Sequence, residues 1–299
     1  MPRLAALAAA LVLGAGCSPA AGAPAPASGL PALTQPQAYL PEPAGHTGGS
    51  AVVGDWSFPA SLAPPAPGGP AQTALENVLF AGLLGIHPDL TWFPDLAAEL
   101  PAPPGPDGIL RYKLRPHLSW SDGTPITADD VIYTWQLISG PGNTVAASKA
   151  GYDAISAIDR ISDLEVAIHF SRPYPAYPLL FGFLLPKHRL GGIDLSKLGS
   201  DPYWSKPDVV SGPFQVAELV AGDHITFTPN PHYADGRGAQ GHRARLDRLV
   251  FRAYPTRQAL LAAMEAGEVD APLGLAEHDL AAVAGMSSLV VKLTPLLQY

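Results

Sequence analysis

The chain reads Trp120-Ser121-Asp122-Gly123-Thr124-Pro125-Ile126-Thr127-Ala128-Asp129-Asp130-Val131 near its middle. The Ser-Asp-Gly portion is typical of a turn, and Thr127 can cap the helix that follows. Asp129 and Asp130 would lie in the first turn of that helix, where the helix dipole favours negative charge. The helix then has an apolar stripe at Val131, Trp135 and Ile138. This stretch therefore predicts a tight turn and a capped amphipathic helix packed on a core.

Further segments on both sides of this stretch have strand or helix patterns. Strands are expected where apolar and polar residues alternate or a short apolar run stands alone, at residues 51–53, 110–114, 164–170, 214–219, 224–228 and 249–251. Helices are expected at residues 73–84 and at residues 257–266, the second capped by Thr256 and ended by Gly267. Mixed strands and helices with irregular connections predict an α/β or α+β architecture.

The composition of the 299-residue chain limits its function. It has 18 basic and 26 acidic residues, a formal charge of −8, which argues against a nucleic-acid partner. Cys17 is the only cysteine, so no disulfide and no cysteine-based metal site or nucleophile is expected after it. The 34 prolines and 30 glycines predict a turn-rich fold, and 47% hydrophobic residues can supply its core.

The first 16 residues resemble a secretory signal. Arg3 gives a positive start, residues 4–13 are apolar, and small residues precede Cys17. We interpret residues 1–16 as a lipoprotein signal peptide and Cys17 as the lipidated residue. The alternative is an ordinary signal peptide with an incidental cysteine, because Gly14 stands where such signals usually have leucine. Residues 17–49, rich in Pro and Ala, are expected to form a linker to a membrane anchor outside the cytoplasm.

Motifs for catalysis or metal binding are missing from the sequence. There is no nucleophile elbow, phosphate loop or paired-histidine zinc motif, so we predict no catalytic residue, no metal site and no cofactor. Asp129 and Asp130 are explained by helix capping. Ser148 and Lys149 are neighbours that do not point together, and His232 lies beside a Gly-rich loop. An exported hydrolase therefore stays only a remote alternative.

Collinear phrases between residues 62 and 270 resemble the extracellular solute-binding proteins of family 5, the receptors of peptide-type and some nickel ABC importers. The phrases are Leu62-Ala63-Pro64, Leu79-Phe80-Ala81-Gly82-Leu83-Leu84, residues 120–131 with Tyr133-Thr134-Trp135, Leu164-Glu165-Val166, Arg172-Pro173-Tyr174-Pro175, Leu185-Pro186-Lys187-His188, Ser211-Gly212-Pro213-Phe214, Asn230-Pro231-His232-Tyr233 and Ala266-Gly267-Glu268-Val269-Asp270. Each phrase alone is weak, but their shared order is specific.

The resemblance implies a periplasmic-binding-protein-like type II fold, in which two lobes close on a ligand by hinge motion. We expect residues 50–255 to form the first lobe and residues 256–299 to begin a second lobe that is incomplete. The implied partners are a peptide or small solute, the permease subunits of an ABC importer, and a membrane reached through the lipid anchor. The receptor itself would be a monomer and would perform no chemistry.

The resemblance also suggests which residues contact the ligand. The loop after Leu62-Ala63-Pro64 would line the first-lobe side of the cleft, through backbone groups of Pro67, Gly68, Gly69 and Pro70. Relatives offer an aromatic side chain in the segment that holds Tyr152. Packing as a partly buried side chain is an equally good explanation for Tyr152. Our last candidate is Trp204, for which packing at the surface is the better explanation.

The chain differs from the family in its length, since full-length members are roughly half again to twice as long. The segment after Tyr299 would hold most of the second lobe and the returning strands of the first. We therefore keep a truncated product with little binding of its own as one alternative. A receptor of the same fold for nickel, heme or an oligosaccharide is another.

Overall fold

The structure is a computed structural model that describes residues 3–4, 47–64, 70–87, 90–140, 148–236, 244–275, 279–283, 286 and 289–290. Its helices are α1 (Pro70–Leu79), α2 (Ala128–Ser139), α3 (Lys187–Leu190), α4 (Leu195–Leu198), α5 (Arg257–Glu265) and α6 (Leu280–Val283), with 3₁₀ helices η1 (Tyr152–Ala154), η2 (Tyr177–Leu179) and η3 (Pro202–Trp204). Within these residues, no helix has both the length and the apolar character needed to cross a bilayer. Cys17 and nearly all of the predicted leader and linker lie outside the described residues.

The larger sheet has the strand order β11-β2-β10-β9-β8. Its strands are β2 (Ser50–Asp55), β8 (Phe214–Val220), β9 (His224–Pro229), β10 (Arg248–Ala253) and β11 (Ala271–Pro272). β11, β2 and β10 run parallel, whereas β8 and β9 form an antiparallel hairpin that turns at Gly222 with a positive φ of 77°. The predicted hairpin and the predicted buried strand at residues 249–251 are confirmed.

A smaller sheet has the order β5-β7-β6, formed by β5 (Ile109–Lys113), β6 (Ile155–Ser162) and β7 (Glu165–Phe170). β5 has the predicted alternation of buried and exposed residues. β7 does not, because it is the central strand and its middle residues 166–168 are all buried. β6 has no counterpart in the sequence prediction, since this largely exposed edge strand lacks a clear apolar pattern.

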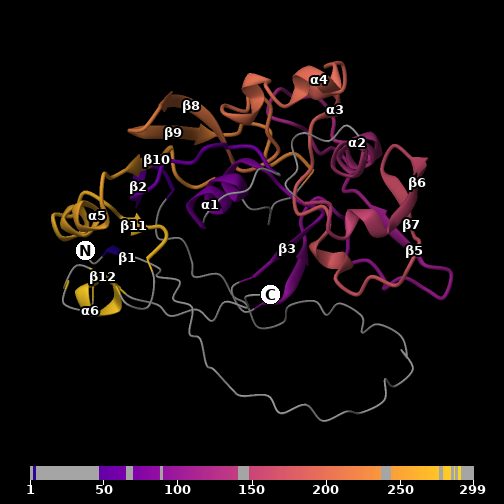
Figure 1. Ribbon diagram of the computed structural model, residues 1–299, viewed down its shortest axis with the longest axis horizontal. Coiled ribbons are helices and arrows are strands. Elements are labelled where there is room, and N and C mark those ends of the chain that lie inside the picture. The colour runs from indigo at the N-terminus through magenta and orange to yellow at the C-terminus, as the bar shows by residue number, and fades with distance from the viewer. Residues whose placement is uncertain are drawn as a thin grey trace, which may run out of the picture.

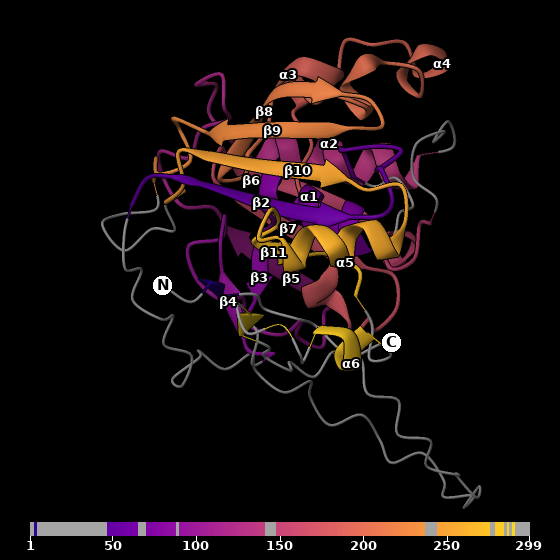
Figure 2. The same cartoon turned by 90° about the vertical axis from the view of Figure 1, so that its left-hand side faces the viewer.

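Two small ribbons complete the strand structure. β3 (Leu84–Ile86) and β4 (Trp92–Pro94) pair in antiparallel fashion, and β1 (Arg3–Leu4) pairs in parallel with β12 (Leu289–Val290). One continuous hydrophobic core joins the two larger sheets through α1 and the segment that follows it. Figure 1 shows α1 between these sheets, and Figure 2 shows α5 and α1 on opposite faces of the five-stranded sheet. α1 therefore contributes Ala71, Leu75 and Leu79 to the core between the two sheets.

The helix caps predicted at Thr127 and Thr256 are confirmed. Thr127 forms a capping box with Asp130 at the start of α2, and the Asp129 amide donates to Thr127 Oγ1 over 3.3 Å. The Ala259 amide donates to Thr256 Oγ1 over 3.1 Å at the start of α5, and Gly267 follows the helix with a φ of 73°. Local sequence therefore determines where these helices begin.

The prediction of a helix over residues 73–84 is wrong at both ends. α1 begins at Pro70 and ends at Leu79, and Leu84 already belongs to β3. The helix stops because groups from a distant loop take its next partners: Gly212 N donates to Leu79 O, and Ala81 N donates to Ser211 Oγ. Leu83 is buried like Leu79, so the apolar spacing reports burial beyond the end of the helix.

The predicted boundary between residues 255 and 256 falls within one continuous sheet of this structure. After β10, α5 packs against β2 around a small second core, and β11 then pairs with β2. Residues 256–272 therefore extend the sheet formed by residues 50–255. The division into two lobes stays a prediction.

Candidate functional site

The parallel strands β2, β10 and β11 end on the same side of the larger sheet, at Asp55, Ala253 and Pro272. We call this side the carboxyl-end edge. Tyr254 N donates to Asp55 O over 2.8 Å, and Leu273 N donates to Gly54 O over 2.7 Å, so the backbone stays paired up to the edge. In open sheets with parallel strands, ligands bind outside the carboxyl ends of the strands. The carboxyl-end edge is therefore the place where a ligand would meet this sheet.

Asp55 is a buried carboxylate at this edge. Its Oδ1 accepts hydrogen bonds from the amide and the hydroxyl of Ser57, both over 2.8 Å. Burial raises the pKa of the Asp55 carboxyl above its ordinary value, although the bonds from Ser57 act in the opposite direction. Trp56 beside it is 36% exposed. Sequence reasoning passed over Asp55, whose only signal is an acidic residue two positions after the predicted strand at 51–53.

The chain that leaves this edge is held by the backbone of Trp204. The Trp204 carbonyl accepts hydrogen bonds from Leu62 N over 2.9 Å, from Ala63 N over 3.3 Å and from the Ser61 hydroxyl over 2.6 Å. The Trp204 indole is buried against Tyr203 and donates to the Leu198 carbonyl. The structure thus brings Trp204 next to the segment that precedes the predicted ligand loop. Its contact here is made by its carbonyl, not by its ring.

The other predicted ligand residues fall in different places. Pro70 is the first residue of α1, and Pro67, Gly68 and Gly69 lie outside the described residues. Tyr152 is buried in η1, packs edge-on against Phe181 and accepts a hydrogen bond from Phe181 N over 2.8 Å. The structure does not bring Tyr152 together with Trp204 or Pro70. The ligand-binding role of all six residues stays a prediction.

We expect Tyr152→Phe and Tyr112→Phe to have different effects on stability. The Tyr152 hydroxyl serves a buried amide, whereas the Tyr112 hydroxyl is buried with no hydrogen-bond partner among the described residues. Tyr152→Phe should lower the free energy of unfolding by about 1–3 kcal/mol, and Tyr112→Phe should leave it unchanged or raise it. Urea denaturation measures both. An equal loss in the two variants would contradict this assignment.

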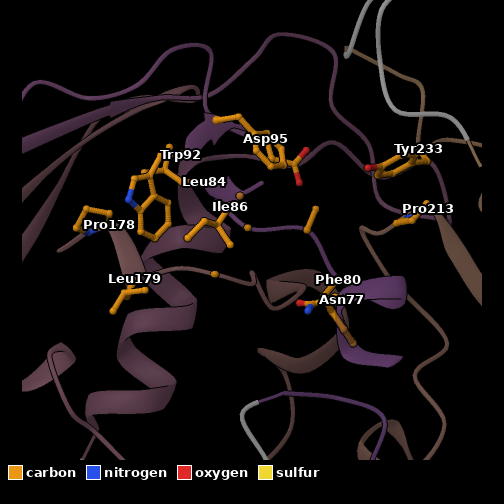
Figure 3. Close-up of a pocket in the computed structure, with 15 residues that line it drawn as sticks. Asn77, Phe80, Leu84, Ile86, Trp92, Asp95, Pro178, Leu179, Pro213 and Tyr233 are labelled. Carbon is orange, nitrogen blue, oxygen red and sulfur yellow. The ribbon is translucent and has the colours of Figure 1, made fainter. Parts of the chain in front are cut away.

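An apolar pocket of about 490 Å³ lies near the carboxyl end of α1. Figure 3 shows Trp92 and Leu179 along one side of it and Pro213 and Tyr233 along the opposite side. Ile86 and Leu179 are large apolar side chains that are 50% and 54% exposed. Of the predicted ligand residues that the structure describes, none lines this pocket. The pocket is thus separate from the carboxyl-end edge.

Loops from the family-like phrases hold the carboxyl end of α1. Gly212 N donates to Leu79 O over 2.7 Å, and Ala81 N donates to Ser211 Oγ over 3.0 Å. The buried Asn230 fixes this loop, because its Nδ2 donates to Gly212 O and its N donates to Pro213 O, both over 2.9 Å. The phrases at residues 79–84, 211–214 and 230–233 therefore meet at one place. They build the frame around α1.

Residues 120–131 likewise hold neighbouring segments in place. Buried Asp130 accepts hydrogen bonds from Thr127 N over 2.9 Å, Lys187 N over 3.0 Å and Trp120 Nε1 over 3.4 Å. Burial raises the pKa of the Asp130 carboxyl. Exposed Asp129 instead forms an ion pair with Lys187 over 2.9 Å. The two carboxylates therefore bond to different groups, Asp130 to the Lys187 amide and Asp129 to the Lys187 ammonium, and helix capping explains their position.

The remaining chemical candidates from the sequence also have other partners. The Lys149 ammonium donates to the carbonyls of Ser139 and Gly140 at the end of α2, over 3.1 and 2.7 Å, and not to Ser148. His232 pairs with Asp235 over 2.9 Å. In the described part of the chain, no group of three His, Cys, Asp or Glu side chains could hold a metal ion.

Parallel strands with helices on both faces, and a segment held at their carboxyl ends, define an α/β ligand-binding fold. The sequence matches the profile of the bacterial extracellular solute-binding proteins, family 5, over residues 92–299. The chain therefore belongs to this family, whose members bind solutes and are not enzymes. The family predicted from the sequence phrases is confirmed.

Individual relatives agree with this assignment. The oligopeptide-binding protein AppA of Bacillus subtilis is 26% identical over 75% of this chain and 40% of its own length. A putative ABC transporter peptide-binding protein of Brucella ovis is 29% identical over 51% of this chain and 28% of its own length. The chain spans less than half the length of the curated relatives it matches.

Solved structures show the same fold. AppA in complex with a nonapeptide superimposes with a TM-score of 0.68 at 24% identity, over 75% of this chain and 44% of that chain. NikZ of Campylobacter jejuni in complex with Ni(L-His) also gives a TM-score of 0.68, at 22% identity, over 80% of this chain and 45% of that chain. The predicted mixed α/β, binding-protein-like fold is confirmed over the described residues.

Proposed function

We propose that this chain is part of a receptor that binds peptides outside the cytoplasmic membrane and delivers them to an ABC permease. The observation that carries the proposal is its membership of family 5, together with the likeness to AppA, whose solved structure holds a nonapeptide. The receptor binds its solute and passes it on, and performs no chemistry on it.

The proposed binding place is the carboxyl-end edge with the segment that leaves it. A peptide lies in extended form against backbone groups of residues 61–70, with Pro67, Gly68, Gly69 and Pro70 as the nearest residues. The anchoring of residues 61–63 on the Trp204 carbonyl supports this, because a held segment loses less entropy when ligand binds. Trp204 contributes its carbonyl, which holds residues 61–63. A second lobe closes over the ligand.

The proposed export route rests on the sequence. Residues 1–16 direct the chain out of the cytoplasm, Cys17 receives a lipid, and residues 17–49 hold the folded part away from the membrane. A single acyl chain gives weak, reversible anchoring, so two or more chains on Cys17 would be needed for stable attachment. Mass spectrometry of the mature protein, with Cys17→Ala as control, would detect the lipid on the first peptide.

A metal-chelate receptor is the second candidate. It is favoured by the likeness to NikZ, which was solved with Ni(L-His). Such a ligand would also suit a wall whose buried carboxylate, Asp55, is not paired with a basic side chain in the described residues. The same binding edge would then hold a small chelate in place of a peptide.

Isothermal titration separates the two candidates. The purified chain is titrated with a defined mixture of tri- to pentapeptides and, separately, with Ni(L-His). We expect saturable heat with the peptides and none with the chelate. Heat with the chelate alone would favour the second candidate, and no heat with any peptide would contradict the proposed function for this chain.

A further inference from the structure

We propose that Arg189 is a positioning residue for the described chain on either side of the predicted ligand loop. It fixes the Trp204 carbonyl that holds residues 61–63 and the residues 211–212 that hold the end of α1. The expected effect on peptide affinity rests on the proposed function, whereas the contacts of Arg189 do not depend on it. Arg189 does not line the apolar pocket and is not among the residues expected to touch ligand.

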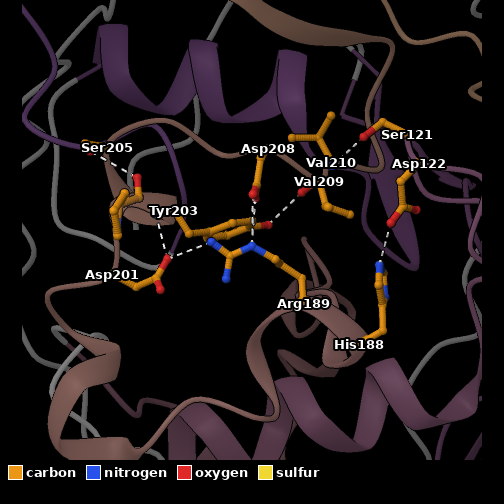
Figure 4. Close-up of polar contacts among 11 residues, drawn as sticks. Ser121, Asp122, His188, Arg189, Asp201, Tyr203, Ser205, Asp208, Val209 and Val210 are labelled. Carbon is orange, nitrogen blue, oxygen red and sulfur yellow. Dashed lines mark hydrogen bonds and ion pairs between the residues drawn. The ribbon is translucent and has the colours of Figure 1, made fainter.

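Arg189 joins three parts of the chain. Its Nε lies 3.0 Å from both carboxylate oxygens of Asp208, and its Nη2 donates to Asp201 Oδ1 over 2.9 Å. Its guanidinium lies over the ring of Tyr203, 5.6 Å from the ring centroid. Figure 4 shows Arg189 at the centre of these contacts, with Asp201 and Asp208 on separate branches. A planar guanidinium can hold two carboxylates at fixed angles, which a lysine cannot do.

The first branch reaches the segment before the ligand loop. Asp201 Oδ1 also accepts the amide of Tyr203 over 2.9 Å, so Asp201 caps η3 while it pairs with Arg189. η3 ends with Trp204, whose carbonyl holds residues 61–63. A shift of Asp201 would therefore move η3 and, with it, the acceptor for Leu62 N and Ala63 N.

The second branch reaches the far end of α1. Asp208 is followed by Val209, whose carbonyl accepts the buried Tyr203 hydroxyl over 2.8 Å. Val210 then exchanges two hydrogen bonds with Ser121, over 2.8 and 3.0 Å. The next residues, Ser211 and Gly212, hold Ala81 and Leu79 at the end of α1.

The Trp204 carbonyl and the loop at residues 211–212 are therefore both linked to the Arg189 side chain. The Asp201 and Arg189 side chains are only 16% and 26% exposed, so water replaces this link poorly. Exposed surface ion pairs contribute little, but a partly buried guanidinium with two carboxylate partners holds its neighbours in one arrangement. The predicted consequence is that residues 61–63 and the end of α1 hold one arrangement before the ligand arrives.

The test is hydrogen exchange of the ligand-free chain, comparing Arg189→Gln with wild type. We expect the amides of Leu62 and Ala63 to exchange at least about tenfold faster, since their acceptor is no longer held. Amides between β9 and β10 should be unchanged. The affinity for the tri- to pentapeptide mixture should fall by up to about tenfold, because the competent loop becomes less populated.

Arg160→Gln is the matched control, since Arg160 also pairs with two carboxylates, Asp129 and Asp163, but lies on β6. It should leave exchange at Leu62 and Ala63 unchanged. Arg189→Lys keeps the charge but not the fork and should give an intermediate effect, and exposed Asp208→Asn tests one branch if Arg189→Gln does not fold. Unchanged exchange at Leu62 and Ala63 in all Arg189 variants would overturn the proposal.

Failure of the proposed function and failure of the Arg189 proposal give different results. Faster exchange with no peptide heat in wild type would uphold the role of Arg189 and reject the proposed function. Peptide heat in wild type, with normal exchange and normal affinity in Arg189→Lys and Asp208→Asn, would uphold the function and reject the role of Arg189.

Discussion

Gly212→Ala is expected to destabilise the protein by about 3 kcal/mol. An added Cβ would lie 2.5 Å from the carbonyl carbon of Leu79 and 2.6 Å from the carbonyl oxygen of Val78. Both are backbone atoms of the last turn of α1, so no side-chain rotation can relieve the contact. The loop must move away and release Leu79 O and Ala81 N.

Gly192→Ala is the control for this prediction. Nothing lies within 4 Å of the position where its Cβ would stand, and its backbone is not in the left-handed region. Urea denaturation should place Gly192→Ala near wild type and Gly212→Ala far below it. Equal stabilities of the two variants would show that the loop at residues 211–214 is not packed on α1 as described.

Asp130→Ala is the second substitution with a large expected effect, a loss of about 3 kcal/mol of unfolding free energy. The Asp130 carboxylate is buried and accepts bonds from Thr127 N, Lys187 N and Trp120 Nε1, so its removal leaves buried donors unpaired. Asp129→Ala is the adjacent control. It removes only surface ion pairs, with Lys187 and Arg160, and should have a much smaller effect.

The pH dependence of the two variants should have opposite signs. Burial raises the folded-state pKa of Asp130, so the folded state binds more protons and its contribution falls as pH rises from about 4 through that raised value. The Lys187 ammonium lowers the pKa of Asp129, so its contribution is present above about 4 and is lost on acidification. Acidification should therefore increase the difference in unfolding free energy between wild type and Asp130→Ala. It should decrease the corresponding difference between wild type and Asp129→Ala. Parallel changes would contradict this.

Local signals in the sequence predict much of the fold. Thr127 and Thr256 mark helix starts, and Gly222 marks the turn of the β8–β9 hairpin, because caps and turns depend on neighbouring residues. The end of α1 depends on Ser211 and Gly212, which lie about 130 residues further along the chain. No local pattern carries that information, so the predicted helix runs on to Leu84.

The site is harder to predict than the fold for the same reason. The role of Arg189 depends on its contacts with Asp201 and Asp208. The sequence Lys187-His188-Arg189 alone indicates only an exposed basic stretch. Trp204 contacts residues 61–63 through its carbonyl, a group that every residue carries and that residue type does not reveal. Sequence reasoning finds residue types, whereas the site depends on backbone groups brought together by tertiary structure.

We propose that a peptide binds at the carboxyl-end edge and not in the apolar pocket. Hydrogen exchange with and without the tri- to pentapeptide mixture tests it most directly. The account predicts that added peptide slows exchange in residues 54–75 and leaves residues 84–86 and 92–95, which border the pocket, unchanged. Protection confined to the residues around the pocket, or no protection anywhere, would contradict it.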